Sequence, residues 1–518
     1  MKPESIRLIL LALLPAAIGS CRPDVGAQLS PRKGEKDVCP DTRLTLTFPV
    51  APVLGTEGKI RITDCATGEV VDSLDMSIPA GPTEPRDYPL DCDYTKVPYD
   101  YSRSFVPTNR TTQPGTPSGT AERTPADYQL NIIGGFTDAF HFHPVLIREN
   151  KAVVCLHNNV LEYGHTYAVS MEAGVLTCPE SNFDGISPRD NWTFSIKEQA
   201  AQAVTADTIV VDAGGNGDFC TVQGALDAVP DFKSRQTTIL IRQGDYEEIV
   251  YARNKSNVVL KGEGKDLVRV HYANNEVFNP HPLKVKTNEW PGTFPSRRAA
   301  FMLDNCSDII LEDFTVATDL QGQAEGLLLN GERILLHRLH IIGSGDALQA
   351  NGTICMAECE LDGGGDTILG RGSLFAWRSH FRNDGGPFTW VRNTEGHHGD
   401  IFVECILEGR DGRMADYGRT KTNHGTSYPF AEQVLIDCKV LNIIPEGWSN
   451  IGCQSAVMLE YGTVDLETGL PADVSRRHPW SRQLQMPADS ALVSSYRNPA
   501  FVLDGWNPFE GYFRSGEK

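Results

Sequence analysis

Four absences narrow what this chain of 518 residues can be. Its 47 Lys and Arg residues are outnumbered by 67 Asp and Glu, and the net charge of −20 excludes a nucleic-acid binder, which needs a basic footprint. Beyond the N-terminal leader, no apolar run approaches the roughly 20 residues that span a bilayer. Long amphipathic crossover helices are missing, which excludes an α/β sheet. No Gly-x-Ser-x-Gly motif occurs, so a serine-hydrolase elbow is unsupported.

The first twenty residues have the pattern of an export signal. A basic start and a short apolar run lead through Ile18-Gly19-Ser20 to Cys21. This ending resembles the lipobox of bacterial lipoproteins, in which the peptide is cut before a cysteine that becomes acylated. We therefore expect a signal peptide over 1–20, a lipid on Cys21 and a tether over 21–39. The protein would then be an exported lipoprotein of the outer membrane, facing the periplasm or the cell surface. The alternative is an ordinary secretory signal with a chance cysteine.

Besides Cys21, the chain has twelve cysteines, which an exported protein can pair. Three recur in one alternating pattern that places each thiol on the same face as an apolar residue, which predicts buried free thiols. They are Cys359, Cys405 and Cys438. The sequence does not determine the pairing of others, such as Cys39, Cys65 and Cys92.

Two regions with different β patterns make up the rest of the chain. Over 40–197, short segments alternate with period two between Gly or Pro, which predicts a small β module. Its stretch 161–167 resembles the strand entry of bacterial Ig-like domains. A Pro- and Thr-rich segment over 80–128 indicates a long insertion, and polar, Ala-rich residues predict a linker over 198–207.

The second region, 208–518, opens with a predicted strand and a short amphipathic helix over 221–229. Apolar triplets then start at Ile309, Ile334, Ile354 and Leu374, at intervals of 25, 20 and 20 residues. A strand that recurs at such a period between glycine-rich corners is typical of a coiled stack of parallel strands. The fold class is therefore all-β: a right-handed parallel β-helix with a smaller N-terminal Ig-like sandwich.

Two aspartates share the period of the triplets. Asp346 and Asp366 lie 20 residues apart, and glycines precede both. Equivalent positions in stacked parallel strands lie about 4.8 Å apart, so the two carboxylates should lie one above the other. Carboxylates that close cannot both ionise cheaply, and the pair then supplies one acid and one nucleophile or base. The alternative is two solvated turn residues, because Asp is common in Gly-Asp corners.

The motifs of the second region occur in the order found in the pectinesterases (pectin methylesterases), and the segment from about 208 to 485 resembles that family. A single short match is weak evidence, whereas this many in one order is strong. The matches are 211–219 for the first strand, 244–248 for G-x-Y-x-E, 323–324 for Q-A-V-A-L, 345–348 for Q-D-T-L, 365–370 for V-D-F-I-F-G and 417–419 for L-G-R-P-W.

This resemblance implies a carboxylic ester hydrolase that removes methyl esters from galacturonate units of pectin or a related polysaccharide and releases methanol. Asp366 is the implied nucleophile, and Asp346 the general acid that then serves as the base. Arg419 is implied to keep Asp366 ionised, and Gln323 to donate to the oxyanion. No metal or other cofactor is implied. The expected partner is methylated pectic polysaccharide, with membrane contact only through the lipid anchor, and we expect a monomer.

Several positions near these residues depart from the family pattern. Gly345 stands where the family has the glutamine before the acid/base aspartate, so an oxyanion donor is missing unless a backbone N–H or Gln349 replaces it. Thr367 replaces an aromatic residue beside the nucleophile. Thr420-Lys421 replaces the Pro-Trp that would form a platform for the sugar.

Phe388 and Trp390 are the candidate replacements for that platform, and with Gly345 and Thr367 they are the predicted substrate-binding positions. For either aromatic alone, a buried core residue is the more common role. The departures favour an atypical substrate cleft, because both aspartates and the arginine are present. An inactive or weak pectin-binding protein on an esterase scaffold is the alternative function. A lyase on the same type of β-helix would normally need an acidic calcium cluster near a basic residue.

Overall fold

The computed structural model describes residues 26–84, 128–134, 140–198, 207–279, 297–421, 425 and 427–510. The predicted signal peptide, Cys21 and most of the predicted insertion lie outside the described residues. No helix in the described part of the chain is long and apolar enough to cross a membrane.

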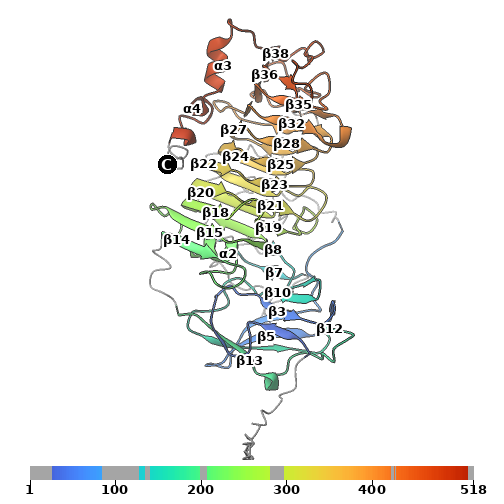
Figure 1. The fold of residues 1–518 in the computed structure, drawn as a ribbon, viewed down its shortest axis with the longest axis vertical. Helices are drawn as coiled ribbons and strands as arrows, with labels where there is room; N and C mark the ends of the chain where they lie inside the picture. The colour runs from blue at the N-terminus through green and yellow to red at the C-terminus, as the bar shows by residue number, and fades with distance from the viewer. Residues whose placement is uncertain are drawn as a thin grey trace, which may run out of the picture.

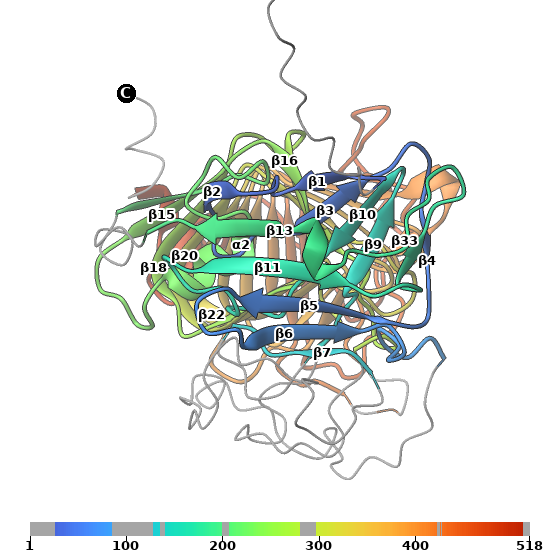
Figure 2. The same ribbon diagram turned by 90° about the horizontal axis from the view of Figure 1, so that it is seen from below.

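The N-terminal module consists of two β-sheets that enclose one core (Figure 2). Alternate side chains of both sheets point between them, including Leu44, Ile62 and Phe194, each at most 1% exposed. One sheet has the order β1 (Gln28–Ser30), β3 (Leu44–Thr47), β10 (Lys151–Val154) and β9 (Val145–Arg148). The other has the order β2 (Glu35–Val38), β13 (Trp192–Ile196), β11 (Thr166–Met171), β5 (Lys59–Asp64) and β6 (Val70–Asp75). Two minor pairs join β12 (Leu176–Thr177) to β4 (Val53–Leu54) and β7 (Leu130–Asn131) to β8 (Phe140–His141).

The tether expected over 21–39 is therefore too long. Strands β1 and β2 already belong to the module, and the indole of Trp192 donates a hydrogen bond to the carbonyl of Pro31 at 2.7 Å. These two strands are mostly polar and exposed, which is why hydrophobic alternation did not reveal them. The two-sheet sandwich is a feature of the structure, and its assignment as Ig-like stays a prediction.

Above this module the chain forms a long parallel β-helix (Figure 1). Its largest sheet follows the order β14 (Thr208–Val211), β15 (Thr237–Ile241), β18 (Ser256–Gly262), β20 (Phe301–Glu312), β22 (Leu327–His337), β24 (Leu348–Ala357), β27 (Ser373–Trp377), β31 (Asp400–Val403), β34 (Glu432–Ile436), β36 (Val457–Tyr461) and β38 (Arg482–Gln483). Strand β17 (Val250–Arg253) joins β20, while β26 (Ile368–Gly370) joins β24 and β30 (Thr389–Val391) joins β26.

A second parallel sheet forms another face of the coil. Its order is β16 (Gly244–Glu247), β19 (Val268–Tyr272), β21 (Thr315–Thr318), β23 (His340–Ile342), β25 (Glu360–Gly363), β28 (His380–Asn383), β32 (Ile406–Gly409), β35 (Lys439–Leu441) and β37 (Val464–Asp465). A short third pair joins β29 (Gly386–Pro387) to β33 (Ala415–Asp416). The core of the domain lies between these sheets.

The apolar triplets occupy equivalent places on successive rungs, as predicted. Ile309 pairs with Ile334, Ile334 with Ile354, and Ile354 with Leu374. All four are at most 1% exposed. Cys359, Cys405 and Cys438 are buried free thiols, which confirms the prediction made for them.

Short helices lie at the start of the described coil and along its outer side. Helix α2 (Val222–Ala228) lies at its start, where Thr221 caps the helix by accepting the N–H of Gly224. Near the C-terminus, α3 (Ser490–Tyr496) and α4 (Pro499–Val502) pack against the outer side of the large sheet (Figure 1). Two 3-10 turns, η1 (Pro188–Asp190) and η2 (Arg410–Gly412), complete the elements.

Candidate active site

One corner of the β-helix collects the predicted catalytic residues. Phe301, Leu327, Leu348, Ile368 and Thr389 are register partners on five consecutive rungs. The segments that enter these rungs therefore stack at the spacing of parallel strands, about 4.8 Å. Four chemically active side chains come from the segments just before the first four positions: Arg298, Gln323, Asp346 and Asp366.

The two aspartates occupy neighbouring rungs, as their 20-residue separation predicted. The carbonyl of Thr367 accepts the N–H of Ala347 at 2.9 Å, so the backbones directly after the two aspartates are in contact. Their side chains are 11% exposed for Asp346 and 15% for Asp366. Both carboxylates are thus shielded from water and still reachable from the surface.

Arg419 holds the carboxylate of Asp366 with two donors. Its Nε lies 2.7 Å from Oδ1, and its Nη2 donates to Oδ2. Such a fork fixes the orientation of a carboxylate. The guanidinium in turn lies over the ring of Trp390, 4.1 Å from the ring centroid, and Arg419 donates its backbone N–H to the carbonyl of Thr389.

A second arginine, which the sequence analysis missed, holds Asp346. Arg298 donates from Nη2 to Asp346 Oδ2 at 2.5 Å and from Nε to Glu325 Oε2 at 2.8 Å. Its Nη1 donates to the amide oxygen of Gln323. Glu325 has a fully buried side chain, so it needs a cationic partner. Arg298 therefore links the acid/base candidate and the oxyanion candidate through one guanidinium.

A signal for this cluster was present in the sequence. Glu325 occupies the place of the apolar valine in the Q-A-V-A-L motif, and a carboxylate inside an apolar motif requires a partner. The partner itself, Arg298, lies 27 residues earlier and two rungs away from Asp346, and no motif marks it.

The pKa of Asp346 is raised to about 7. Burial is the main cause, because it disfavours the charged form, and the carboxylates of Glu325 and Asp366 act in the same direction. Arg298 and, more weakly, Arg392 oppose the shift. An aspartate with this pKa holds its proton in mildly acidic solution, as a general acid must.

Backbone geometry explains why Gly345 is not a glutamine. Its φ of +72° lies in the left-handed region, and a Cβ at this position would approach the carbonyl oxygen of Gly322 to 2.8 Å. Gln349, the other donor considered, is 3% exposed within β24. The donor that the structure places beside Gln323 and Asp346 is Arg298.

The structure does not support Phe388 as part of the predicted sugar platform. Phe388 is fully buried in the core of the coil, and the side chain of Thr367 is also fully buried, with its hydroxyl accepting from Asn383. Trp390 is half-buried, and the guanidinium groups of Arg419 and Arg392 lie 4.1 and 4.3 Å from its centroid. Both guanidinium groups cover part of this ring, and the role of Trp390 as a sugar platform stays a prediction.

The fold and site together define a β-helical protein with an arginine-held carboxylate pair, the arrangement of an ester-hydrolase site. The chain belongs to the pectinesterase family, whose model matches residues 208–504. Pectinesterase QRT1 of Arabidopsis thaliana is 29% identical over 320 residues, which cover 58% of this chain and 79% of that protein. Pectinesterase 31 of the same plant is 25% identical over 295 residues, 54% and 88% of the two chains. The solved structure of pectin methylesterase from carrot has 17% identity and a TM-score of 0.47, covering 59% of this chain and 95% of that one.

Proposed function

We propose that this protein hydrolyses the methyl esters of galacturonate units in pectin or a related pectic polysaccharide, releasing methanol. Membership of the pectinesterase family supports the substrate class. The observation that supports the chemistry best is the pair of carboxylates on neighbouring rungs, of which Asp366 is held by two donors of Arg419 and Asp346 has a raised pKa.

The first half of the reaction forms an acyl-enzyme. Asp366 attacks the ester carbonyl carbon as a carboxylate, aimed by the fork of Arg419. Negative charge develops on the carbonyl oxygen, and the amide of Gln323 donates to it. Because the oxygen of this amide is already bound by Arg298, its NH₂ group points away from the guanidinium. Asp346 gives its proton to the departing methanol.

In the second half the roles of Asp346 are reversed. Having lost its proton, it is a carboxylate that can take a proton from water, which then attacks the acyl-enzyme. This step releases the free galacturonate carboxylate and regenerates Asp366. Arg298 stabilises the charged form of Asp346 between the two proton transfers, because it donates directly to Oδ2.

Methanol release from highly methylated pectin tests this function directly. We expect the wild-type protein to release methanol and Asp366→Ala to release none above background. Circular dichroism and the unfolding temperature show whether the variant retains the fold, and Asp384→Ala, in an exposed position on the following rung, is the matched control. No methanol from any methylated galacturonan, with intact protein, would refute the proposal. Binding of pectin that persists without turnover would favour the pectin-binding alternative.

We further propose that the protein is exported and anchored by a lipid on Cys21, as a monomer. The run of small residues that ends at this cysteine supports the anchor. Mass spectrometry of the N-terminal peptide from membrane fractions should find an acylated cysteine, and Cys21→Ser should move the protein out of those fractions. Light scattering of the Cys21→Ser protein should give the mass of one chain. An unmodified Cys21 would leave the ordinary secretory signal as the explanation.

A further inference from the structure

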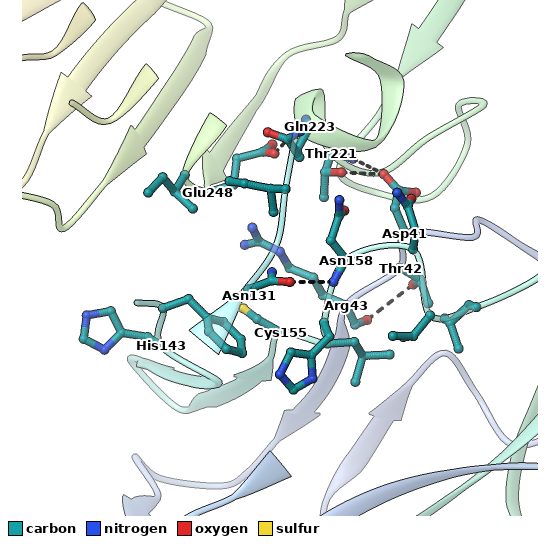
Figure 3. Close-up of a pocket in the computed structure, with 18 of the residues that line it drawn as sticks. Asp41, Thr42, Arg43, Asn131, His143, Cys155, Asn158, Thr221, Gln223 and Glu248 are labelled. Carbon is teal, nitrogen blue, oxygen red and sulfur yellow. Dashed lines mark hydrogen bonds between the residues drawn. The ribbon is translucent and has the colours of Figure 1, made fainter. Parts of the chain in front are cut away.

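The N-terminal module is docked on the first rungs of the β-helix through polar contacts across a pocket (Figure 3). Arg43 donates to the backbone carbonyl of Glu247 at 2.6 Å. Asn158 donates to the carboxylate of Asp227 in α2 at 2.6 Å. Lys197, just after the last strand of the module, donates to the carbonyl of Gly217 at 2.9 Å. These contacts fix the position of the N-terminal module relative to the first rungs of the β-helix.

Two cysteines meet at this junction, one from each side. Cys39 directly follows β2 of the module, and Cys220 lies two residues before α2 of the β-helix. Their sulfur atoms and a carboxylate oxygen of Asp41 all lie within 4.8 Å of one another. The thiol of Cys39 also contacts the backbone: its sulfur lies 3.6 Å from the carbonyl oxygen of Gly217.

The surroundings of this cluster suit a sulfur–sulfur bond better than a metal ion. Asp41 is the third potential ligand, yet its carboxylate already accepts the N–H of Cys220 at 2.9 and 3.0 Å, the N–H of Thr221 at 2.7 Å and the hydroxyl of Thr221 at 2.6 Å. It acts as an anchor for the start of α2, as Figure 3 shows for Asp41 and Thr221. Two thiols then remain, fewer than the three protein ligands that even an open zinc site uses.

We propose that Cys39 and Cys220 form a disulfide that covalently joins the N-terminal module to the β-helix. The oxidant is a small or protein disulfide, RSSR. One cysteine thiolate attacks a sulfur of RSSR and releases RS⁻, giving a mixed disulfide. The second thiolate attacks the sulfur of the first cysteine, forms the new S–S bond and releases the other RS⁻. Two thiol protons pass to the two RS⁻ groups, so one RSSR is reduced to two RSH for each disulfide formed.

The site favours this exchange. The pKa of Cys39 is lowered, chiefly because the thiol of Cys220 donates to its sulfur, and the same contact raises the pKa of Cys220, so Cys39 is the first thiolate to attack. Both cysteines also line a cavity of about 630 Å³ between the module and the β-helix, where Cys220 is half-buried and Cys39 is 1% exposed. The buried cysteines of the β-helix rungs, such as Cys405, have raised pKa values and are fully enclosed by the coil.

The test treats the full-length protein with oxidised glutathione or with a reductant, followed by alkylation and peptide mapping without reduction. We expect a linked peptide containing Cys39 and Cys220, about 2 Da lighter than the sum of the two reduced peptides. We also expect a higher unfolding temperature for the oxidised protein. Cys39→Ser and Cys220→Ser should each abolish the linked peptide and the redox dependence of the unfolding temperature. Cys65→Ser, at an exposed site of the same module, is the control and should change neither.

Two results would overturn the proposal. One is the recovery of both cysteines as alkylated free thiols after oxidation of folded protein. The other is stoichiometric zinc binding that Cys39→Ser, Cys220→Ser and Asp41→Asn each abolish, measured with zinc alone, which would make the cluster a metal site. Because peptide mapping needs no substrate, neither result depends on esterase activity.

Discussion

Arg298 gives the most informative prediction, because it separates catalysis from stability at one site. Replacing it alone with Met leaves Glu325 buried and unpaired, which should cost about 3–5 kcal/mol of folding free energy. The double variant Arg298→Met/Glu325→Val removes the Arg298–Glu325 pair and restores the apolar residue of the family motif. Asp346 loses its Arg298 donor, but the charges of Arg298 and Glu325, which shift its pKa in opposite directions, are removed together. Exchanging a buried pair for apolar residues is close to neutral for stability, so this double variant should unfold near the wild-type temperature.

The activity of the double variant should nevertheless fall. The side chain of Gln323 is exposed, and the Arg298 contact is what fixes its amide. A freed side chain of this type regains about 1.5–2 kcal/mol of rotamer entropy, which corresponds to about a 10- to 30-fold lower kcat. Initial rates of methanol release at saturating pectin measure this loss. KM should change little, since the contact acts on the transition state.

A double-mutant cycle tests whether Arg298 affects kcat through its contact with Gln323. Gln323→Ala removes an oxyanion donor, and we expect kcat to fall about 100- to 1000-fold. If Arg298 acts through Gln323, adding Arg298→Met/Glu325→Val to Gln323→Ala should lower kcat by less than threefold more, as expected for residues that act as a unit. Fully additive losses, or a folded double variant with wild-type kcat, would refute the reasoning.

Three further outcomes follow from the site. The pKa of Asp346, raised to about 7, keeps the acid protonated below that pH, so kcat/KM should fall about tenfold per unit above pH 7; a rate still rising at pH 9 would contradict the assignment. Trp390→Leu removes a cation–π contact with Arg419 that is worth about 0.5–2 kcal/mol, so kcat should drop about 2- to 30-fold. Loss of pectin binding with unchanged kcat would instead indicate that Trp390 is a sugar platform. Gly345→Gln should not restore the family's oxyanion donor and should lower stability by about 1–2 kcal/mol in denaturant unfolding, because its φ is +72°; a more active and equally stable variant would contradict this.

The periodicity of the sequence predicted the β-helix well, because the length of one rung determines how often apolar residues recur. Each rung needs an apolar triplet facing the core, so Ile309, Ile334, Ile354 and Leu374 had to recur at the rung length. The same period placed Asp346 and Asp366 together, and the family motif supplied Arg419 as the partner of Asp366, which the structure confirms.

The features that the sequence did not predict depend on interactions that no local sequence pattern encodes. Strands β1 and β2 are short and polar, so they lack the alternation that marks a half-buried strand. Phe388 was a candidate sugar contact with a buried aromatic as the alternative, and its place between β29 and β30 directs it into the core. Arg298 belongs to the site only because its long side chain crosses two rungs to reach Asp346.

The stacking of the catalytic corner also limits how such a site can change. Arg298, Gln323, Asp346 and Asp366 each enter from a separate turn of one coil, so the separation of the reacting groups is a multiple of the strand spacing. Corner segments can lengthen or shorten without altering that separation, whereas losing one turn would shift a group by a whole step. Adjustment of this site is therefore confined to exchanging side chains at fixed heights, as at Glu325, which stands where the family motif has a valine.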